Sequence, residues 1–144
     1  MITIVVPLDG SELSERVLPY VENLASRLHA EVYLIQVLDT RPTTADVLII
    51  PRSMEDDLRH AEEYLSGLAS AWQAKDIDTS WEVLHGIPAS SIINCARLHK
   101  AFMIAMSTHG RSGLSRMVFG SVADQVMREA GIPVLLVRPE EEAL

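Results

Sequence analysis

The sequence predicts an α/β protein in which one parallel β-sheet is covered by helices on both faces, giving three layers. Short apolar segments alternate with segments whose apolar residues recur at helical spacing, in the order βαβαβαβαβ. The short segments are apolar on both faces, which is typical of buried parallel strands. The length of 144 residues is that of one ordinary domain, so we expect a single domain over residues 1–144.

Composition and charge exclude several classes of protein. Hydrophobic residues make up 48% of the chain and charged residues 22%, as in globular proteins. The net charge of −8 argues against a general affinity for nucleic acid or for an anionic membrane. The apolar runs at residues 4–8 and 132–137 are far shorter than the ~20 residues of a membrane span. With Cys95 as the only cysteine and no signal-peptide pattern, we expect a cytoplasmic protein.

The first half of the chain predicts two strands and one helix. Residues 1–8 predict a buried strand, and residues 13–28 have the apolar spacing of a helix. Pro19 lies within that helix and should kink it, because proline has no N–H to donate. Residues 31–37 predict a second strand. Residues 39–52 then form a connection longer than the usual two to six residues, and we expect it to be mobile without ligand.

The second half begins with the clearest helix in the sequence. Apolar residues between 54 and 72 follow a 4-3-4-3-4 spacing, which predicts one long helix packed on the sheet. Residues 78–84 alternate between apolar and polar, as in a half-exposed edge strand. Pro88 is well placed to begin a helix that runs to about Leu98. Residues 101–106 are all apolar and predict another buried strand.

A polar, glycine-rich segment at residues 107–120 joins that strand to a helix at 121–130, and the last strand follows at 133–137. Free N–H groups at a helix N-terminus favour an anion, and glycines let backbone amides approach a ligand closely. The segment contains Arg111 and Arg116 and no acidic residue, although the whole chain is acidic. These residues fit a phosphate-binding loop, and they also fit an ordinary solvated turn.

The same segment resembles the nucleotide-binding motif of the universal stress protein family, G-x2-G-x9-G-[S/T]. Gly110, nine further residues and Gly120-Ser121 match the motif, whereas Ser107 stands in place of its first glycine. The segment fits neither the Walker A pattern nor the G-x-G-x-x-G fingerprint. The resemblance covers nearly the whole chain, and its other similar stretches are residues 4–11, 83–88, 106–113 and 133–138.

This resemblance implies a Rossmann-like, adenine nucleotide alpha hydrolase-like fold with a five-stranded parallel sheet in the order 3-2-1-4-5. The ligand site would then lie where the strand order reverses. The implied ligand is ATP, or ADP or AMP, with any Mg²⁺ or Mn²⁺ carried by the phosphates. The implied binding residues are Pro7, Asp9, Val37, Met106, Ser107, Gly110, Arg111, Gly120, Ser121 and Val122.

Two of these assignments, and the role of the neighbouring His109, leave alternatives open. Asp9 would meet the adenosine, with Pro7 and Val37 beside the adenine, but Asp9 also fits an Asx turn that caps the first helix. Ser107 would weaken binding if the backbone there needed a positive φ or if the residue touched a phosphate, whereas at negative φ its hydroxyl can add a donor. His109 fits a general acid or base beside a phosphate, and it also fits a loop histidine bonded to backbone.

The histidines and the cysteine carry no metal-binding pattern of their own. The remaining histidines are scattered, with no i,i+4 pairing and no acidic partner at metal-ligand spacing, so we expect no metal site made by the protein; they are His29, His60, His85 and His99. Cys95 is expected to pack in the core.

The resemblance implies an ATP-binding regulator or signalling module of the stress response, with at most slow hydrolysis. A slow ATPase or nucleotidyl hydrolase is one alternative, and a dimerisation module that binds no nucleotide is another. We expect a homodimer that pairs through the last strand, Pro133 to Val137, because an unpaired apolar edge promotes aggregation.

Overall fold

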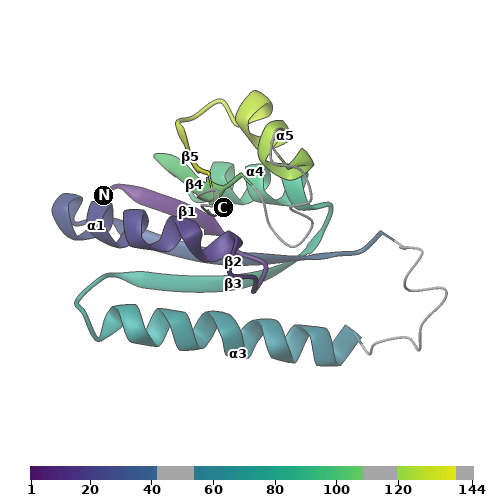
Figure 1. The fold of residues 1–144 in the computed structure, drawn as a ribbon, viewed down its shortest axis with the longest axis horizontal. Helices are drawn as coiled ribbons and strands as arrows, with labels where there is room; N and C mark the ends of the chain where they lie inside the picture. The colour runs from purple at the N-terminus through teal and green to yellow at the C-terminus, as the bar shows by residue number, and fades with distance from the viewer. Residues whose placement is uncertain (42–53, 109–119, 139–144) are drawn as a thin grey trace, which may run out of the picture.

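A five-stranded parallel sheet forms the centre of the molecule (Figure 1). The computed structural model describes residues 1–41, 54–108 and 120–138. The strands are β1 (Thr3–Pro7), β2 (Glu31–Asp39), β3 (Thr79–Gly86), β4 (Met103–Ser107) and β5 (Val134–Val137). Their order is β3-β2-β1-β4-β5, and every neighbouring pair is parallel. The fold class and the strand order expected from the sequence are therefore confirmed.

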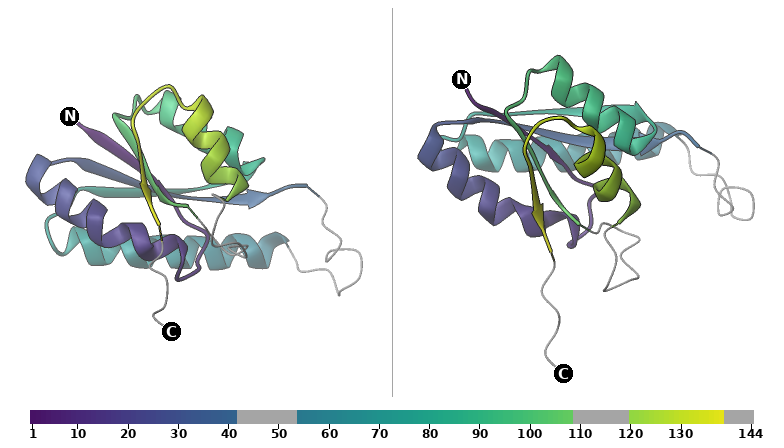
Figure 2. Two further views of the ribbon diagram at one scale, coloured as in Figure 1. Left: turned by 45° about the horizontal axis from the view of Figure 1, so that its top comes forward. Right: turned by 90° about the horizontal axis from the view of Figure 1, so that it is seen from above.

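Four α-helices cover the two faces of this sheet in the described residues (Figure 2). Helices α1 (Leu18–Leu28) and α3 (Met54–Gln73) pack on one face. Helices α4 (Pro88–Leu98) and α5 (Ser121–Glu129) pack on the other. The helix α4 begins at Pro88, as expected, because proline has no N–H to lose at the first helical position.

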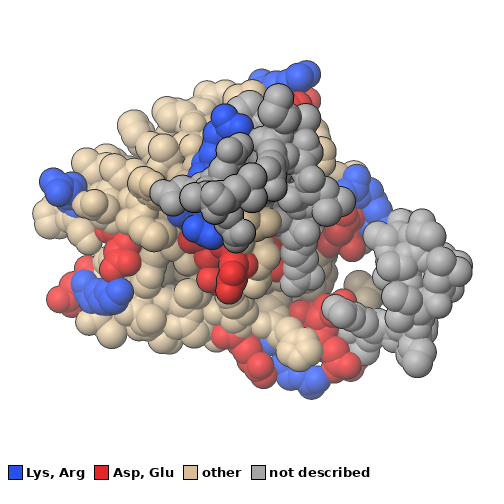
Figure 3. Space-filling model, viewed as in Figure 1, with Lys and Arg blue, Asp and Glu red and all other residues tan. Residues whose placement is uncertain are grey.

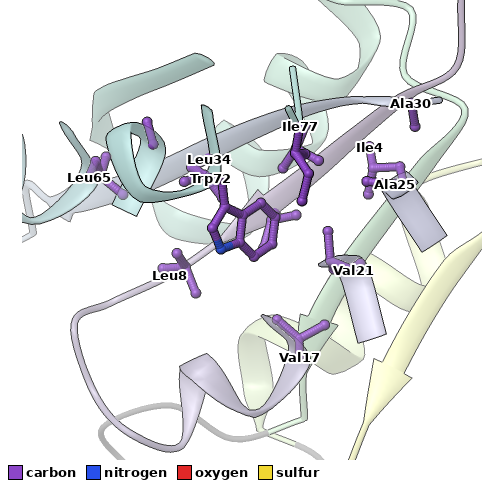
Figure 4. Close-up of a cluster of buried hydrophobic side chains, with 14 residues drawn as sticks. Ile4, Leu8, Val17, Val21, Ala25, Ala30, Leu34, Leu65, Trp72 and Ile77 are labelled. Carbon is purple, nitrogen blue, oxygen red and sulfur yellow. The ribbon is translucent and has the colours of Figure 1, made fainter. Parts of the chain in front are cut away.

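Two clusters of buried side chains hold these layers together. The cluster under α1 and α3 has Trp72 at its centre, where the indole lies close to Leu8, Val21 and Ile77 (Figure 4). The cluster under α4 and α5 joins side chains of those helices to Val5, Ile35 and Ile104 of the sheet. Burial of each large apolar side chain contributes roughly 1.5–3 kcal/mol, so the clusters stabilise both faces.

The first helix differs from the expectation. The chain forms a short 3₁₀ helix, η1 (Ser14–Val17), and α1 starts only at Leu18. Pro19 therefore lies in the first turn of α1, where N–H groups have no acceptor within the helix. The expectation of a kink assumed that Pro19 lies inside the helix; the structure places it in the first turn, where proline removes no hydrogen bond of the helix.

The two edges of the sheet differ in character. Strand β3 forms one edge, as its alternating pattern indicates, and β5 forms the other with all four residues partly exposed. Acidic and basic side chains are interspersed on the face shown in Figure 3. None of the helices in the described ranges is long and apolar enough to cross a membrane. The connection predicted to be mobile, residues 39–52, falls outside the described residues from position 42 onward.

Candidate functional site

A cavity of about 210 Å³ lies at the carboxyl ends of β1 and β4, where the strand order reverses. Ligands of open α/β sheets bind at such a reversal, because the loops after the two strands diverge there. The loop after β1 and the start of α5 contribute to the cavity, and so do β2, β4 and the first turns of α4. The lining residues are Pro7, Leu8, Asp9, Ser14, Val37, Pro88, Ile92, Met106, Ser107, Thr108, Gly120, Ser121, Val122 and Ala123.

Most of the residues expected at a ligand site come together here. Those in the lining are Pro7, Asp9, Val37, Met106, Ser107, Gly120, Ser121 and Val122. The remaining two, Gly110 and Arg111, lie outside the described residues, and so does His109. Contact of these residues with a nucleotide stays a prediction.

The lining divides into an apolar and a polar part. Pro7, Val37, Pro88, Ile92 and Met106 offer apolar surface from two strands, the end of β1 and the start of α4. The polar part consists of Asp9, Ser14, Ser107, Thr108 and Ser121. A mostly apolar cavity with a few polar groups is the usual form of a small-molecule site.

The N-terminus of α5 supplies hydrogen-bond donors to the polar part. Gly120 precedes the helix with φ −56° and ψ 147°, and no side chain caps it. The amides of Ser121, Val122 and Ala123 therefore have no acceptor within the helix, and all three residues line the cavity. The helix dipole adds partial positive charge at this end, which favours an anion.

Two backbone hydrogen bonds fix the chain on either side of residues 109–119. The amide of Gly120 donates to the carbonyl oxygen of Thr108 at 2.8 Å, and the amide of Thr108 donates to Val137 at 3.0 Å. Thr108 itself is only 1% exposed. The two ends of the glycine-rich segment are thereby held together beside the cavity, and the Gly120 amide is already engaged.

Asp9 forms the Asx turn that was one of its two interpretations. Its Oδ1 accepts hydrogen bonds from the amide of Ser11 at 2.9 Å and from the Ser11 hydroxyl at 2.5 Å. The Ser11 hydroxyl in turn accepts from the amide of Ser14 at 3.1 Å. These hydrogen bonds fix the position of the Asp9 side chain in the lining of the cavity.

Ser107, the departure from the family motif, has a structural partner. Its hydroxyl donates to the carbonyl oxygen of Ser14 at 3.2 Å, and the residue is 6% exposed. Among the described residues, the non-glycine positions with positive φ are His29, Asp76 and Lys100, so Ser107 needs no glycine geometry. The condition under which its Cβ would strain the backbone is therefore not met.

Several lining residues were not anticipated from the sequence: Leu8, Ser14, Pro88, Ile92 and Ala123. Pro88 was identified only as the start of a helix. Its place in the cavity depends on how α4 crosses β1 and β2, which no local pattern reveals. Leu8 is the last residue of the strand predicted at residues 1–8, and that position was an available signal because strand ends meet at one edge of a parallel sheet.

A second cluster of polar side chains lies at the other end of α4. Glu82 of β3, Cys95 of α4 and His99 just after α4 bring their potential ligand atoms within 4.8 Å of one another. Cys95 is buried as expected, at 4% exposure. Neither Glu82 nor His99 was anticipated, although the four-residue spacing of Cys95 and His99 was a signal for one shared helix face.

The chain is similar to known proteins along almost its whole length. The model of the universal stress protein family matches residues 1–138. Universal stress protein MJ0531 of Methanocaldococcus jannaschii is 36% identical over 145 aligned residues, with 96% of this chain and 84% of the relative covered.

Solved structures agree with the fold. The structure of hypothetical protein MJ0577 superposes with a TM-score of 0.82 at 24% identity and covers 98% of both chains. A universal stress protein from Archaeoglobus fulgidus, solved in complex with dAMP, has a TM-score of 0.70 at 25% identity and covers 94% of this chain and 97% of its own. With the family match over residues 1–138 and the shared strand order, the chain belongs to the universal stress protein family.

Proposed function

We propose that this chain binds an adenine nucleotide, ATP in the first instance, in the cavity between β1 and β4. Occupancy of the cavity then acts as a regulatory signal in the stress response. The proposal rests on one observation: the apolar surface of the cavity lies next to the N-terminal amides of α5, which have no acceptor within the helix. A purine base binds to apolar surface, and a phosphate chain binds to such amides.

The size of the cavity supports a mode of binding in which the base lies inside the cavity and the phosphates lie at its edge. Its volume of about 210 Å³ is below the roughly 300–1,000 Å³ of pockets that enclose drug-sized ligands. The base and part of the sugar would occupy it, against Val37, Pro88 and Met106. The phosphates would then meet the first turn of α5. The Archaeoglobus fulgidus structure with dAMP supports the adenine nucleotide class.

The charges of the cavity favour a binding role over rapid hydrolysis. Among its described lining residues, Asp9 is the single charged side chain, and its Oδ1 is engaged by Ser11. General-base catalysis needs a group within hydrogen-bond reach of the attacking water. Hydrolysis would then rest on positioning alone, and we expect it to be slow. Mg²⁺ or Mn²⁺ would accompany the phosphates as their counterion.

Gly120→Val tests the placement of the phosphates. The backbone of Gly120 has negative φ, so valine can adopt it, and the folded state should survive. The added side chain lies at the start of α5, where it should exclude the phosphate chain and abolish ATP binding in calorimetry. Gly67→Val is the matched control, because nothing lies within 4 Å of a Cβ added there. Full ATP affinity in Gly120→Val would contradict the site.

Ser121→Ala tests the hydroxyl at the first position of α5. We expect ATP binding to weaken by about 1–2 kcal/mol, the scale of one hydrogen bond to a charged group. Ser70→Ala, on the exposed side of α3, is the control and should bind as the wild type does. A phosphate-release assay on the wild type and on His109→Ala distinguishes an ATP-binding regulator from an ATP-hydrolysing enzyme. Rapid ATP turnover in the wild type that is lost in His109→Ala would favour the enzyme.

A further inference from the structure

The cluster at the end of α4 combines three kinds of metal-binding side chain. Glu82 offers a carboxylate oxygen, Cys95 a sulfur and His99 an imidazole nitrogen, all within 4.8 Å of one another. Cys95 is buried, whereas His99 is exposed, so the cluster is open to solvent on the His99 side. None of these residues lines the nucleotide cavity.

The fold brings the three side chains together for simple reasons. Cys95 and His99 are four residues apart, which puts them on the same side of α4 and one turn from each other. Glu82 pairs with Ile35 in the parallel register of β2 and β3. Ile35 packs in the cluster under α4, so Glu82 projects from the same face of the sheet toward that helix.

Tyr33 of β2 holds two members of the cluster in place. Its hydroxyl donates to Oε1 of Glu82 at 2.6 Å. Its ring lies 4.1 Å from the ring of His99, centroid to centroid, with 36° between the planes. Metal ligands are commonly oriented by such outer partners, which fix the carboxylate and the imidazole before a metal arrives.

We propose that Glu82, Cys95 and His99 form a zinc site, with Tyr33 as a positioning residue. Sulfur, imidazole and carboxylate together are the donor set that Zn²⁺ takes in proteins. Neighbouring ligand atoms of a tetrahedral zinc site lie roughly 3.3–3.8 Å apart, given zinc–ligand distances of about 2.0–2.3 Å. The present spacing of up to 4.8 Å is about 1 Å wider than this, so the ligand atoms must move closer by about that much when zinc binds. Three protein ligands leave the fourth position to water or to an incoming ligand.

Cys95 is buried between α4 and the sheet, so its sulfur faces Glu82 and His99 and not open solvent. On binding, Zn²⁺ displaces the thiol proton, and its two positive charges balance the thiolate and the carboxylate. The metal would also tie the edge strand β3 to the C-terminal end of α4.

Zinc binding is tested with the full chain after treatment with a chelator. Titration of zinc chloride against a chromophoric competitor should give one zinc per chain. Cobalt(II) should give tetrahedral d–d absorption with a thiolate-to-metal charge-transfer band. Zinc should also raise the thermal unfolding midpoint, because a ligand that binds the native state stabilises it. The absence of a stoichiometric site, or of the thiolate band, would overturn the proposal.

Variants assign the site to these side chains. His99→Gln and Glu82→Gln should each lower zinc affinity by at least about tenfold, and Tyr33→Phe by about 10–100-fold with the cobalt–thiolate band retained. His60→Gln, an exposed histidine of α3, is the matched control and should bind zinc as the wild type does.

Two outcomes would contradict the assignment. One is unchanged zinc affinity in both His99→Gln and Glu82→Gln. The other is loss of zinc binding in Gly120→Val, which would place the metal at the nucleotide cavity instead.

Discussion

Replacement of Ser107 by alanine tests what the departure from the family motif does. The Ser107 hydroxyl is buried and donates to the carbonyl of Ser14 at 3.2 Å, which joins the end of β4 to the turn after β1. A hydrogen bond between uncharged groups contributes about 0.5–1.5 kcal/mol, so Ser107→Ala should lower the free energy of unfolding by about 1 kcal/mol. Ser107→Gly should cost a further 0.5–1 kcal/mol or so, because glycine loses more backbone freedom on folding than alanine does.

Urea unfolding followed by circular dichroism measures these changes. With an m-value of roughly 2 kcal/mol/M, a loss of 1 kcal/mol moves the midpoint down by about 0.5 M. Ser80→Ala in β3 is the matched control, since it removes a hydroxyl from a strand outside the cavity. Calorimetry with ATP should show nearly the same affinity in the wild type and in both Ser107 variants, because the hydroxyl is engaged with Ser14.

Two results would refute this reasoning. If Ser107→Ala kept full stability but lost ATP affinity, the hydroxyl would be a ligand donor and not a structural one. If Ser107→Gly bound ATP at least ten times more tightly than the wild type, the Cβ of Ser107 would obstruct the ligand despite the permitted backbone.

Three further changes test the core, the assembly and the response to pH. Leu65→Ala, at a side chain with 0% exposure, should cost about 2–5 kcal/mol in urea unfolding, and a loss well under that range would mean that the core refills the space. Leu135→Lys in the edge strand β5 should give folded monomers in sedimentation, whereas a persistent dimer would place the interface elsewhere. Burial and the hydrogen bond to Glu15 raise the pKa of Tyr64. Wild-type stability should therefore fall as pH rises above about 10, the pKa of an unfolded tyrosine, and Tyr64→Phe should remove that part of the slope.

The sequence predicted most of the secondary structure because local patterns decide it. The apolar spacing between residues 54 and 72 matches α3, and Pro88 marks the first residue of α4. The division of the predicted helix into η1 and α1 was missed, because apolar spacing does not distinguish a 3₁₀ turn from an α-turn. Alternating strands and helices also determined the parallel sheet, because a right-handed crossover helix must lie between parallel strands.

The cavity at the ends of β1 and β4 was predicted in part. The ends of β1 and β4 were identified because parallel strands bring their carboxyl ends to one edge, and the resemblance gave the strand order. Pro88 and Ile92 were not identified, since their place in the lining follows from how α4 lies across the sheet. The partner of the Ser107 hydroxyl, the carbonyl of Ser14, is 93 residues away in the chain.

The proposed zinc site depends almost wholly on the tertiary structure. The four-residue spacing of Cys95 and His99 can be seen in the sequence. Glu82 and Tyr33 come close to them only because β2 pairs with β3 and α4 packs on the same face of these strands. By itself the sequence determined the elements and their alternation, because side-chain periodicity and turn chemistry act over a few residues. Tertiary structure decided which side chains meet, because contacts between distant segments depend on register, on the face of the sheet and on helix placement together.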